Sequence, residues 1–188
     1  AVPVFNYFSD SLQKQIESKN PRTESPRGGK IDFDVPGKFV GNWFLKNTTY
    51  AGGKIKPFCG DYLCPYWNGH LAFIYDFIDP AQIRVSIGFD SKLGDQGPYG
   101  IKGNAPDPKT MGVKDGMIRY ELVKLNDITT EKGFKSQGKA LITENSNVLL
   151  GTMLLEMIDE RHLKMEVFPG KSATQVQGFT TKAMVYER

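Results

Sequence analysis

The regular alternation of side chains between residues 81 and 89 restricts the fold of this chain more than any other feature. Apolar residues occupy every second position, and the residues between them are small or polar: Ala81, Ile83, Val85, Ile87 and Phe89 alternate with Gln82, Arg84, Ser86 and Gly88. Successive side chains of a β-strand point to opposite faces of the sheet, so this period of two predicts a strand with one buried face.

Similar runs cover much of the chain after residue 37. We expect further strands at residues 38–47, 70–77, 117–125, 137–145, 148–158, 162–168 and 179–188, and a short one around 99–102. The connections that can be read, such as residues 145–147 and 159–161, are short, which favours antiparallel hairpins between consecutive strands. No helix of the length that a parallel crossover needs lies between the strands, so a doubly wound α/β sheet is excluded.

A row of antiparallel strands this long predicts an all-β fold. Closure into an up-and-down barrel removes the two unpaired edges that an open sheet would expose. We therefore predict an antiparallel barrel of about eight to nine strands, with a two-sheet β-sandwich as the alternative, because periodicity does not separate the two. The length of 188 residues and the hydrophobic fraction of 39% suit one such domain, residues 38–188.

The N-terminal segment has a different pattern. A helix is predicted over residues 5–20, because Leu12 and Ile16 lie one helical turn apart and Pro21 ends the run. Residues 21–37 are rich in Arg, Ser, Gly and Pro and are interpreted as a linker strap. We expect residues 1–37 to form a unit outside the barrel, with its helix packed against the barrel wall.

The strand expected at residues 148–158 departs from simple alternation, because apolar side chains populate both of its faces. One face carries Leu149, Met153, Leu155 and Met157, and the other carries Val148, Leu150, Leu154 and Ile158. Both faces should therefore be covered, either by the N-terminal helix or by a second copy of the chain in a homodimer.

Two terminal motifs resemble a known family. The segment Phe39-Val40-Gly41-Asn42-Trp43 opens the first strand with Gly-x-Trp after a helical lead-in, and the chain ends in Met184-Val185-Tyr186-Glu187-Arg188. The N-terminal motif resembles the opening of the calycins, meaning the lipocalins and the intracellular fatty-acid-binding proteins. The C-terminal motif is similar to the last strand of the fatty-acid-binding branch. The resemblance implies a calycin-like barrel in which Trp43 and a basic residue, Arg188 or Arg161, close one end.

Two departures from the family's pattern concern its ligand. The fatty-acid-binding branch has a helix-turn-helix lid after the first strand, whereas residues 47–69 here are rich in Gly, Pro and Cys. That branch also has an Arg two residues before the Tyr to hold a ligand carboxylate, and this position is Met184 here. The resemblance therefore implies the barrel without the arginine that binds a fatty-acid carboxylate.

The two cysteines bear on the compartment. Cys59 and Cys64 are close enough in sequence to form a disulfide around a turn, and such pairs persist in oxidising compartments. A glycosylation sequon begins at Asn47, and the chain starts with Ala-Val-Pro, which fits either removal of a signal peptide or a cloning boundary. We expect an extracytoplasmic protein, secreted or periplasmic. In a reducing compartment the alternatives are free thiols or a zinc site in which Asp61 and His70 join the two sulfurs.

Charge and hydropathy exclude two classes of partner. The formal net charge is +3, and the basic residues are dispersed rather than aligned on one helix, so nucleic-acid binding is not expected. No run approaches the ~18 consecutive apolar residues of a membrane span, so no integral membrane segment is expected. The carboxylates of Asp90, Asp95, Asp107 and Asp115 are candidate calcium ligands, but turns select Asp as well, so neither a metal nor another cofactor is predicted.

Aromatic residues gather before and within the strand expected at 70–77, and they suggest a function. We expect an aromatic-lined barrel or barrel mouth that binds a small apolar or amphipathic molecule without catalysis. Residues 88–116 would act as its lid. The expected ligand-binding residues are Tyr66, Trp67, His70, Phe73 and Tyr75.

Two other function classes remain open. One is a secreted or surface interaction module whose barrel is filled by side chains, with a homodimer through strand 148–158 as one form. The other is an enzyme that uses His70 with Asp76 or Asp79 as an acid–base pair, although none of the recognised hydrolase or metalloprotease motifs is present.

Overall fold

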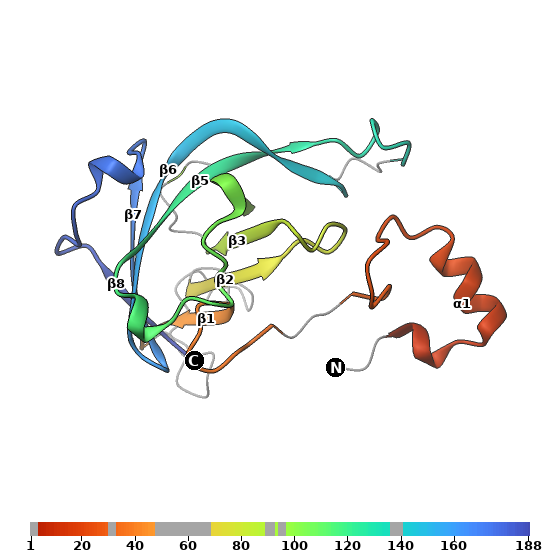
Figure 1. Ribbon diagram of the computed structural model, residues 1–188, viewed down its shortest axis with the longest axis horizontal. Helices are drawn as coiled ribbons and strands as arrows, with labels where there is room; N and C mark the ends of the chain where they lie inside the picture. The colour runs from red at the N-terminus through yellow and green to blue at the C-terminus, as the bar shows by residue number, and fades with distance from the viewer. Residues whose placement is uncertain (1–3, 30–32, 48–68, 89–92, 94–96, 136–140) are drawn as a thin grey trace, which may run out of the picture.

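The chain folds into a β-barrel with an N-terminal appendage (Figure 1). This computed structural model describes residues 4–29, 33–47, 69–88, 93, 97–135 and 141–188. The strands are β1 (Gly41–Leu45), β2 (His70–Tyr75), β3 (Ile83–Ile87), β4 (Gly97–Ile101), β5 (Ile118–Asp127), β6 (Thr143–Asp159), β7 (His162–Pro169) and β8 (Met184–Glu187). One α-helix, α1 (Asp10–Glu17), precedes them.

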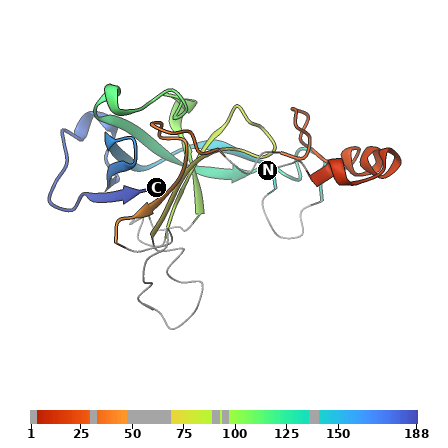
Figure 2. The same ribbon diagram turned by 90° about the horizontal axis from the view of Figure 1, so that it is seen from below.

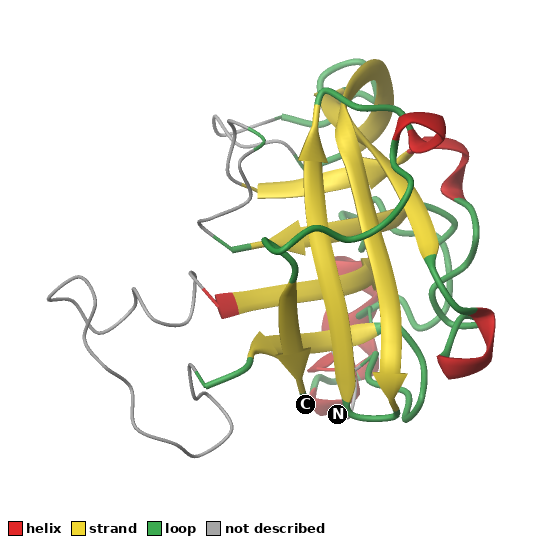
Figure 3. Ribbon diagram, turned by 90° about the vertical axis from the view of Figure 1, so that its left-hand side faces the viewer, coloured by secondary structure: helices red, strands yellow, loops and turns green. Residues whose placement is uncertain are grey.

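The eight strands close in sequence order, and every neighbouring pair is antiparallel, including β8 with β1. The predicted up-and-down barrel is therefore confirmed, and it fits the calycin class at the level of the barrel. The β-sandwich alternative is wrong, because Phe44 pairs with Glu187 and Leu45 with Tyr186 to complete the ring. Figure 3 shows the strands wrapping around one shared interior.

Several of the predicted strand boundaries are wrong, among them those of the last strand, which is Met184–Glu187 rather than 179–188. The runs at 137–145 and 148–158 were expected to be separate strands, but Thr143–Asp159 is one continuous strand, and the expected turn at 145–147 lies inside it. The short run near residue 99 is the full strand β4. Strand β6 bends sharply where its register with β5 shifts, and Gly151 adopts a φ of 158° there, which a side chain would disfavour.

Past this bend, β5 and β6 leave the barrel as a two-stranded arm. The pairs from Leu125 with Asn145 to Asp127 with Thr143 lie in this arm. In Figures 1 and 2 the arm extends to the same side of the barrel as α1.

The inward side chains of all eight strands pack into one apolar core. Its largest members come from β1, β2, β5 and the segment before β1. The aromatic residues of this core are Phe39, Trp43, Phe73, Tyr99, Tyr120 and Tyr186. The middle of the barrel is therefore filled by side chains, as in other small barrels.

The outer face of β6 is covered only in part, because Leu154 is buried whereas Val148 and Ile158 are more than half exposed. The N-terminal helix is not the cover over Leu154, and a second copy of the chain stays a prediction. Leu154 points outward and is 0% exposed. It pairs with Arg119 of β5 and Glu166 of β7. Arg119 donates a hydrogen bond to the Val176 carbonyl, and Glu166 accepts one from the Thr180 amide. The connection between β7 and β8 therefore lies over Leu154 and shields it.

The N-terminal unit is attached through the turn between β2 and β3. The Arg22 guanidinium donates a hydrogen bond of 2.6 Å to the Phe77 carbonyl and lies 5.8 Å from the centre of the Phe77 ring. Arg27 donates hydrogen bonds to the carbonyls of Glu17 and Asn20, which join the end of α1 to the strap. The helix lies outside the barrel as predicted, but none of its residues is buried.

Candidate functional site

Trp43 and Arg188, the two residues that the terminal motifs indicated, lie together at one end of the barrel. The Arg188 guanidinium lies 3.6 Å from the centre of the Trp43 ring. It also donates hydrogen bonds to the carbonyls of Val35, Lys38 and Val40. The Trp43 indole N–H donates to the Phe39 carbonyl at 2.8 Å. Burial lowers the pKa of Arg188 to about 10. Arg161, the alternative partner in the sequence, instead donates to the Arg188 carbonyl from an exposed position.

The connection between β4 and β5 covers the same end. Tyr120 and Tyr75 both reach it from inside the barrel, donating hydrogen bonds to the Pro106 carbonyl and the Asp107 carboxylate. The amide of Phe39 donates to the Met111 carbonyl. Residues 102–116 therefore plug the Trp43 end. Of the predicted lid, residues 89–92 and 94–96 lie outside the described part of the chain.

The structure does not gather the predicted ligand-binding residues at one site. Phe73 is fully buried in the core, 6.0 Å from the Tyr120 ring. Tyr75 lies at the plugged end, and burial together with the Asp107 contact raises its pKa well above the usual range. His70 lies at the other end of β2 on the outer face. Tyr66, Trp67, Cys59 and Cys64 lie outside the described residues, so the aromatic mouth, the disulfide and the zinc set stay predictions.

His70 lies beside polar and aromatic neighbours on the barrel wall. Its Nε2 is 3.1 Å from the Asn42 side-chain oxygen, and its ring lies 5.7 Å from that of Phe44. Burial lowers its pKa from 6.5, which favours the neutral imidazole. Asp76 follows the last residue of β2, and its carboxylate bonds Arg84 instead.

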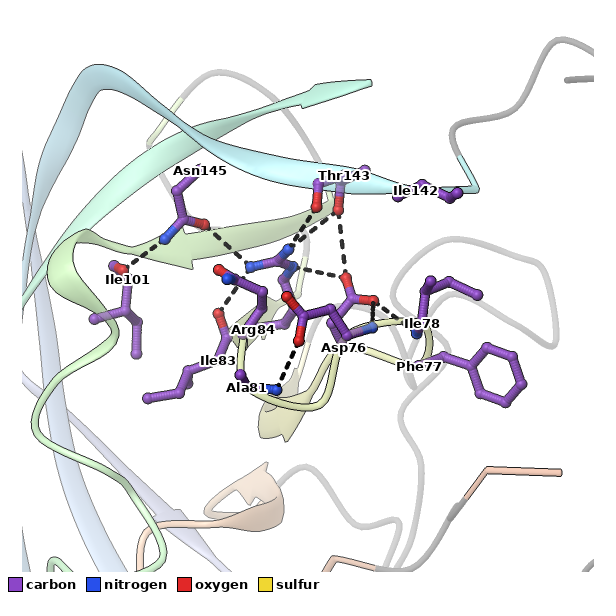
Figure 4. A network of polar contacts seen from close by, with 12 residues as sticks. Asp76, Phe77, Ile78, Ala81, Ile83, Arg84, Ile101, Ile142, Thr143 and Asn145 are labelled. Carbon is purple, nitrogen blue, oxygen red and sulfur yellow. Dashed lines mark hydrogen bonds and ion pairs between the residues drawn. The ribbon is translucent and has the colours of Figure 1, made fainter. Parts of the chain in front are cut away.

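Asp76 belongs to a buried network that holds the arm against the barrel (Figure 4). Arg84 is 3% exposed on the outer face of β3, and its Nε donates to Asp76 at 3.0 Å. Its other nitrogens donate to the carbonyl of Ile83, to the side-chain oxygen of Asn145, and to the carbonyl and hydroxyl of Thr143. All donor groups of the guanidinium are thus engaged, so this cluster is a structural clamp rather than an acid–base site.

A cavity of about 270 Å³ lies at the barrel end opposite Trp43. Odd-numbered strands end there and even-numbered strands begin there, so the last residues of β3 and β7, Ile87 and Pro169, meet the first residue of β8, Met184. We call this cavity the β7–β8 pocket. Its lining residues are Ile87, Met165, Glu166, Val167, Phe168, Pro169, Lys171, Thr180, Lys182 and Met184.

The pocket exists because β7 is longer than β8. Their pairing runs from His162 with Glu187 to Met165 with Met184, and β7 then continues to Pro169 without β8 beside it. The sequence missed this site, because the last strand was expected at 179–188 and would have covered β7 throughout. Within residues 177–182 only Gly178 is a strong turn former, so the sequence carries little signal for the short length of this strand.

Within the described residues, no cluster of three metal-ligating side chains is present. In the same part of the chain, no helix is long and apolar enough to cross a membrane. The chain matches no protein-family model, no curated protein and no solved structure.

Proposed function

We propose that this protein binds a small apolar or amphipathic molecule without converting it, and that the molecule occupies the β7–β8 pocket. The observation that carries the proposal is a cavity with both apolar and polar lining residues at one barrel end, while Trp43 and Arg188 pack together at the other. Ligand sites are concave and mainly apolar, with a few polar groups at their edges. We also propose that the barrel is calycin-like.

The residues that line this pocket differ from the ligand contacts that the sequence predicted. Phe73 and Tyr75 are engaged in the core and the plugged end, so they are not available as ligand contacts. Met165, Val167 and Met184 take their place as apolar contacts. Tyr66 and Trp67 stay candidates for further contacts.

A blocking substitution tests the proposal. Val167→Trp places an indole in the pocket and should abolish binding of a small neutral apolar probe such as toluene, measured by saturation-transfer NMR. Val148→Trp, at a valine on the arm that is 55% exposed, is the matched control and should leave binding unchanged. Equal binding by both variants would contradict the proposed site, provided that circular dichroism shows both to be folded.

Native and denaturing mass spectra of protein purified from its own host, without reduction, test the function more directly. A small molecule that is released on denaturation would support the proposal and give the ligand's chemical class. The same spectra would show whether Cys59 and Cys64 have lost two hydrogens to a disulfide. An empty protein that also fails to bind the probe would contradict the proposal.

An interaction module is the second candidate function. It is favoured by the filled barrel interior and by two large apolar side chains exposed near and on the arm, Leu141 and Val148. In this case sedimentation velocity would reveal concentration-dependent association that Val148→Asp removes. Val113→Asp, at an exposed valine outside the arm, would leave the association intact.

A further inference from the structure

We propose that the ligand of the β7–β8 pocket is a short anionic amphiphile that binds with its apolar part inward and its charged group outward, between Lys171 and Lys182. This inference rests on the proposed function, because it assigns a ligand class and an orientation to the same pocket. The floor, the wall, the rim and the size of the cavity each support it.

The floor of the pocket is apolar. Met165 is 0% exposed, and Ile87, Val167 and Met184 pack against the barrel core beside it. A charged group placed there would lose its water without gaining a partner, which opposes binding in that orientation. The apolar part of an amphiphile therefore belongs on the floor.

The acidic side chain in the pocket wall is already engaged. Glu166 is 5% exposed, and its two carboxylate oxygens accept hydrogen bonds from the amide and the hydroxyl of Thr180. These bonds hold the connection before β8 against β7, which fixes the position of Lys182 two residues later. Glu166 therefore shapes the pocket, and its single negative charge is outnumbered by the two lysines of the pocket lining.

The rim carries two lysines that come from two different parts of the chain. Lys171 follows Gly170 in the turn after β7, and its Nζ lies 5.7 Å from the centre of the Phe168 ring. Lys182 lies in the connection that leads into β8, and both lysines are exposed. In the part of the chain that the structure describes, neither lysine forms an ion pair. Two such ammonium groups beside one engaged carboxylate favour an anionic group at the rim.

The volume sets the length of the apolar part. About 270 Å³ lies just below the ~300–1,000 Å³ range of typical ligand pockets. A single ring or a short alkyl chain fits this space, and a long acyl chain does not.

The test uses three probes that share an octyl tail and differ in the head group: octyl sulfate, octyl glucoside and octyltrimethylammonium. Binding to the full chain is followed by NMR of methyl-labelled methionine. Met165→Leu and Met184→Leu assign the two pocket signals, and Met117, which is exposed outside the pocket, provides a reference signal. Octyl sulfate should shift the Met165 and Met184 signals at the lowest concentration of the three.

The rim is tested by neutralising both lysines. Lys171→Gln with Lys182→Gln should weaken octyl sulfate by about tenfold, because each exposed charge contributes roughly threefold. Octyl glucoside should be unaffected. The matched control, Lys109→Gln with Lys132→Gln, removes two exposed lysines elsewhere and should leave both affinities unchanged.

The outcomes separate this inference from the proposed function. If octyl glucoside binds as tightly as octyl sulfate, or if the rim variant binds octyl sulfate normally, the anionic head group is wrong but the pocket stands. If no probe shifts the pocket signals, both proposals fail. If inorganic sulfate alone competes as well as octyl sulfate does, the lysines form a simple anion site and the amphiphile is wrong.

Discussion

The Arg188 guanidinium stacks on Trp43 at 3.6 Å, and this contact joins the end of β8 to β1. The same guanidinium satisfies three backbone carbonyls of the segment that leads into β1. Arg188 thus covers the barrel end and fixes the entry of the first strand.

Removing this side chain should destabilise the barrel. We expect Arg188→Ala to lower the free energy of unfolding by about 3 kcal/mol, because a stacking contact and charge-assisted hydrogen bonds are lost together. Urea denaturation followed by circular dichroism measures the change. Arg161→Ala, at the other basic residue near this end, should cost less than about 1 kcal/mol. Equal losses would show that Arg188 has no special role in closure.

The buried pair of Arg84 and Asp76 should behave as a clamp for the arm. Arg84→Met leaves the Asp76 carboxylate, which is 13% exposed, without its cation and should cost about 3–5 kcal/mol. Hydrogen exchange should accelerate first at the amides of Thr143 and Asn145, which the guanidinium holds in place.

A double substitution measures the interaction between Arg84 and Asp76 apart from their contacts with other residues. Adding Asp76→Asn to Arg84→Met removes the stranded charge, so the double variant should be more stable than the sum of the two single changes predicts. Strict additivity, or unchanged exchange in the arm, would contradict the clamp.

Leu154 tests how the outer face of β6 is covered. It is 0% exposed under the connection between β7 and β8, so Leu154→Ala should cost about 2–5 kcal/mol. Val148→Ala, on an exposed part of the same strand, should stay within about 0.5 kcal/mol. The loss at Leu154 should not depend on protein concentration. A concentration-dependent loss would place a second copy on this face after all.

His70 should make stability depend on pH. Its pKa in the folded protein is below 6.5, so the unfolded chain binds the proton more tightly. The free energy of unfolding should therefore rise with pH from the lowered pKa up to about 6.5 and level off above it. Urea denaturation at several pH values measures this rise, and His70→Gln should flatten it. An unchanged profile in His70→Gln would assign the dependence to other groups.

The local sequence determined much of the architecture. Period-two alternation is a property of neighbouring residues, so strands such as Ile83–Ile87 and His162–Pro169 could be predicted without knowing their partners. Short connections then required consecutive strands to be antiparallel. An open sheet would expose two unpaired edge strands, which favoured closure into a barrel. The motifs at Trp43 and Arg188 also pointed to one end of the barrel.

The tertiary structure decided the features that arise where two segments far apart in the sequence meet. The bend of β6, the connection that covers Leu154 and the extra length of β7 over β8 depend on packing between residues far apart in the sequence. For this reason the aromatic run near residue 70 predicted a site at Phe73 and Tyr75, whereas packing placed both in the core and at the plugged end. The β7–β8 pocket arises from an unequal pairing of two strands, and neither strand's own sequence encodes where its partner ends.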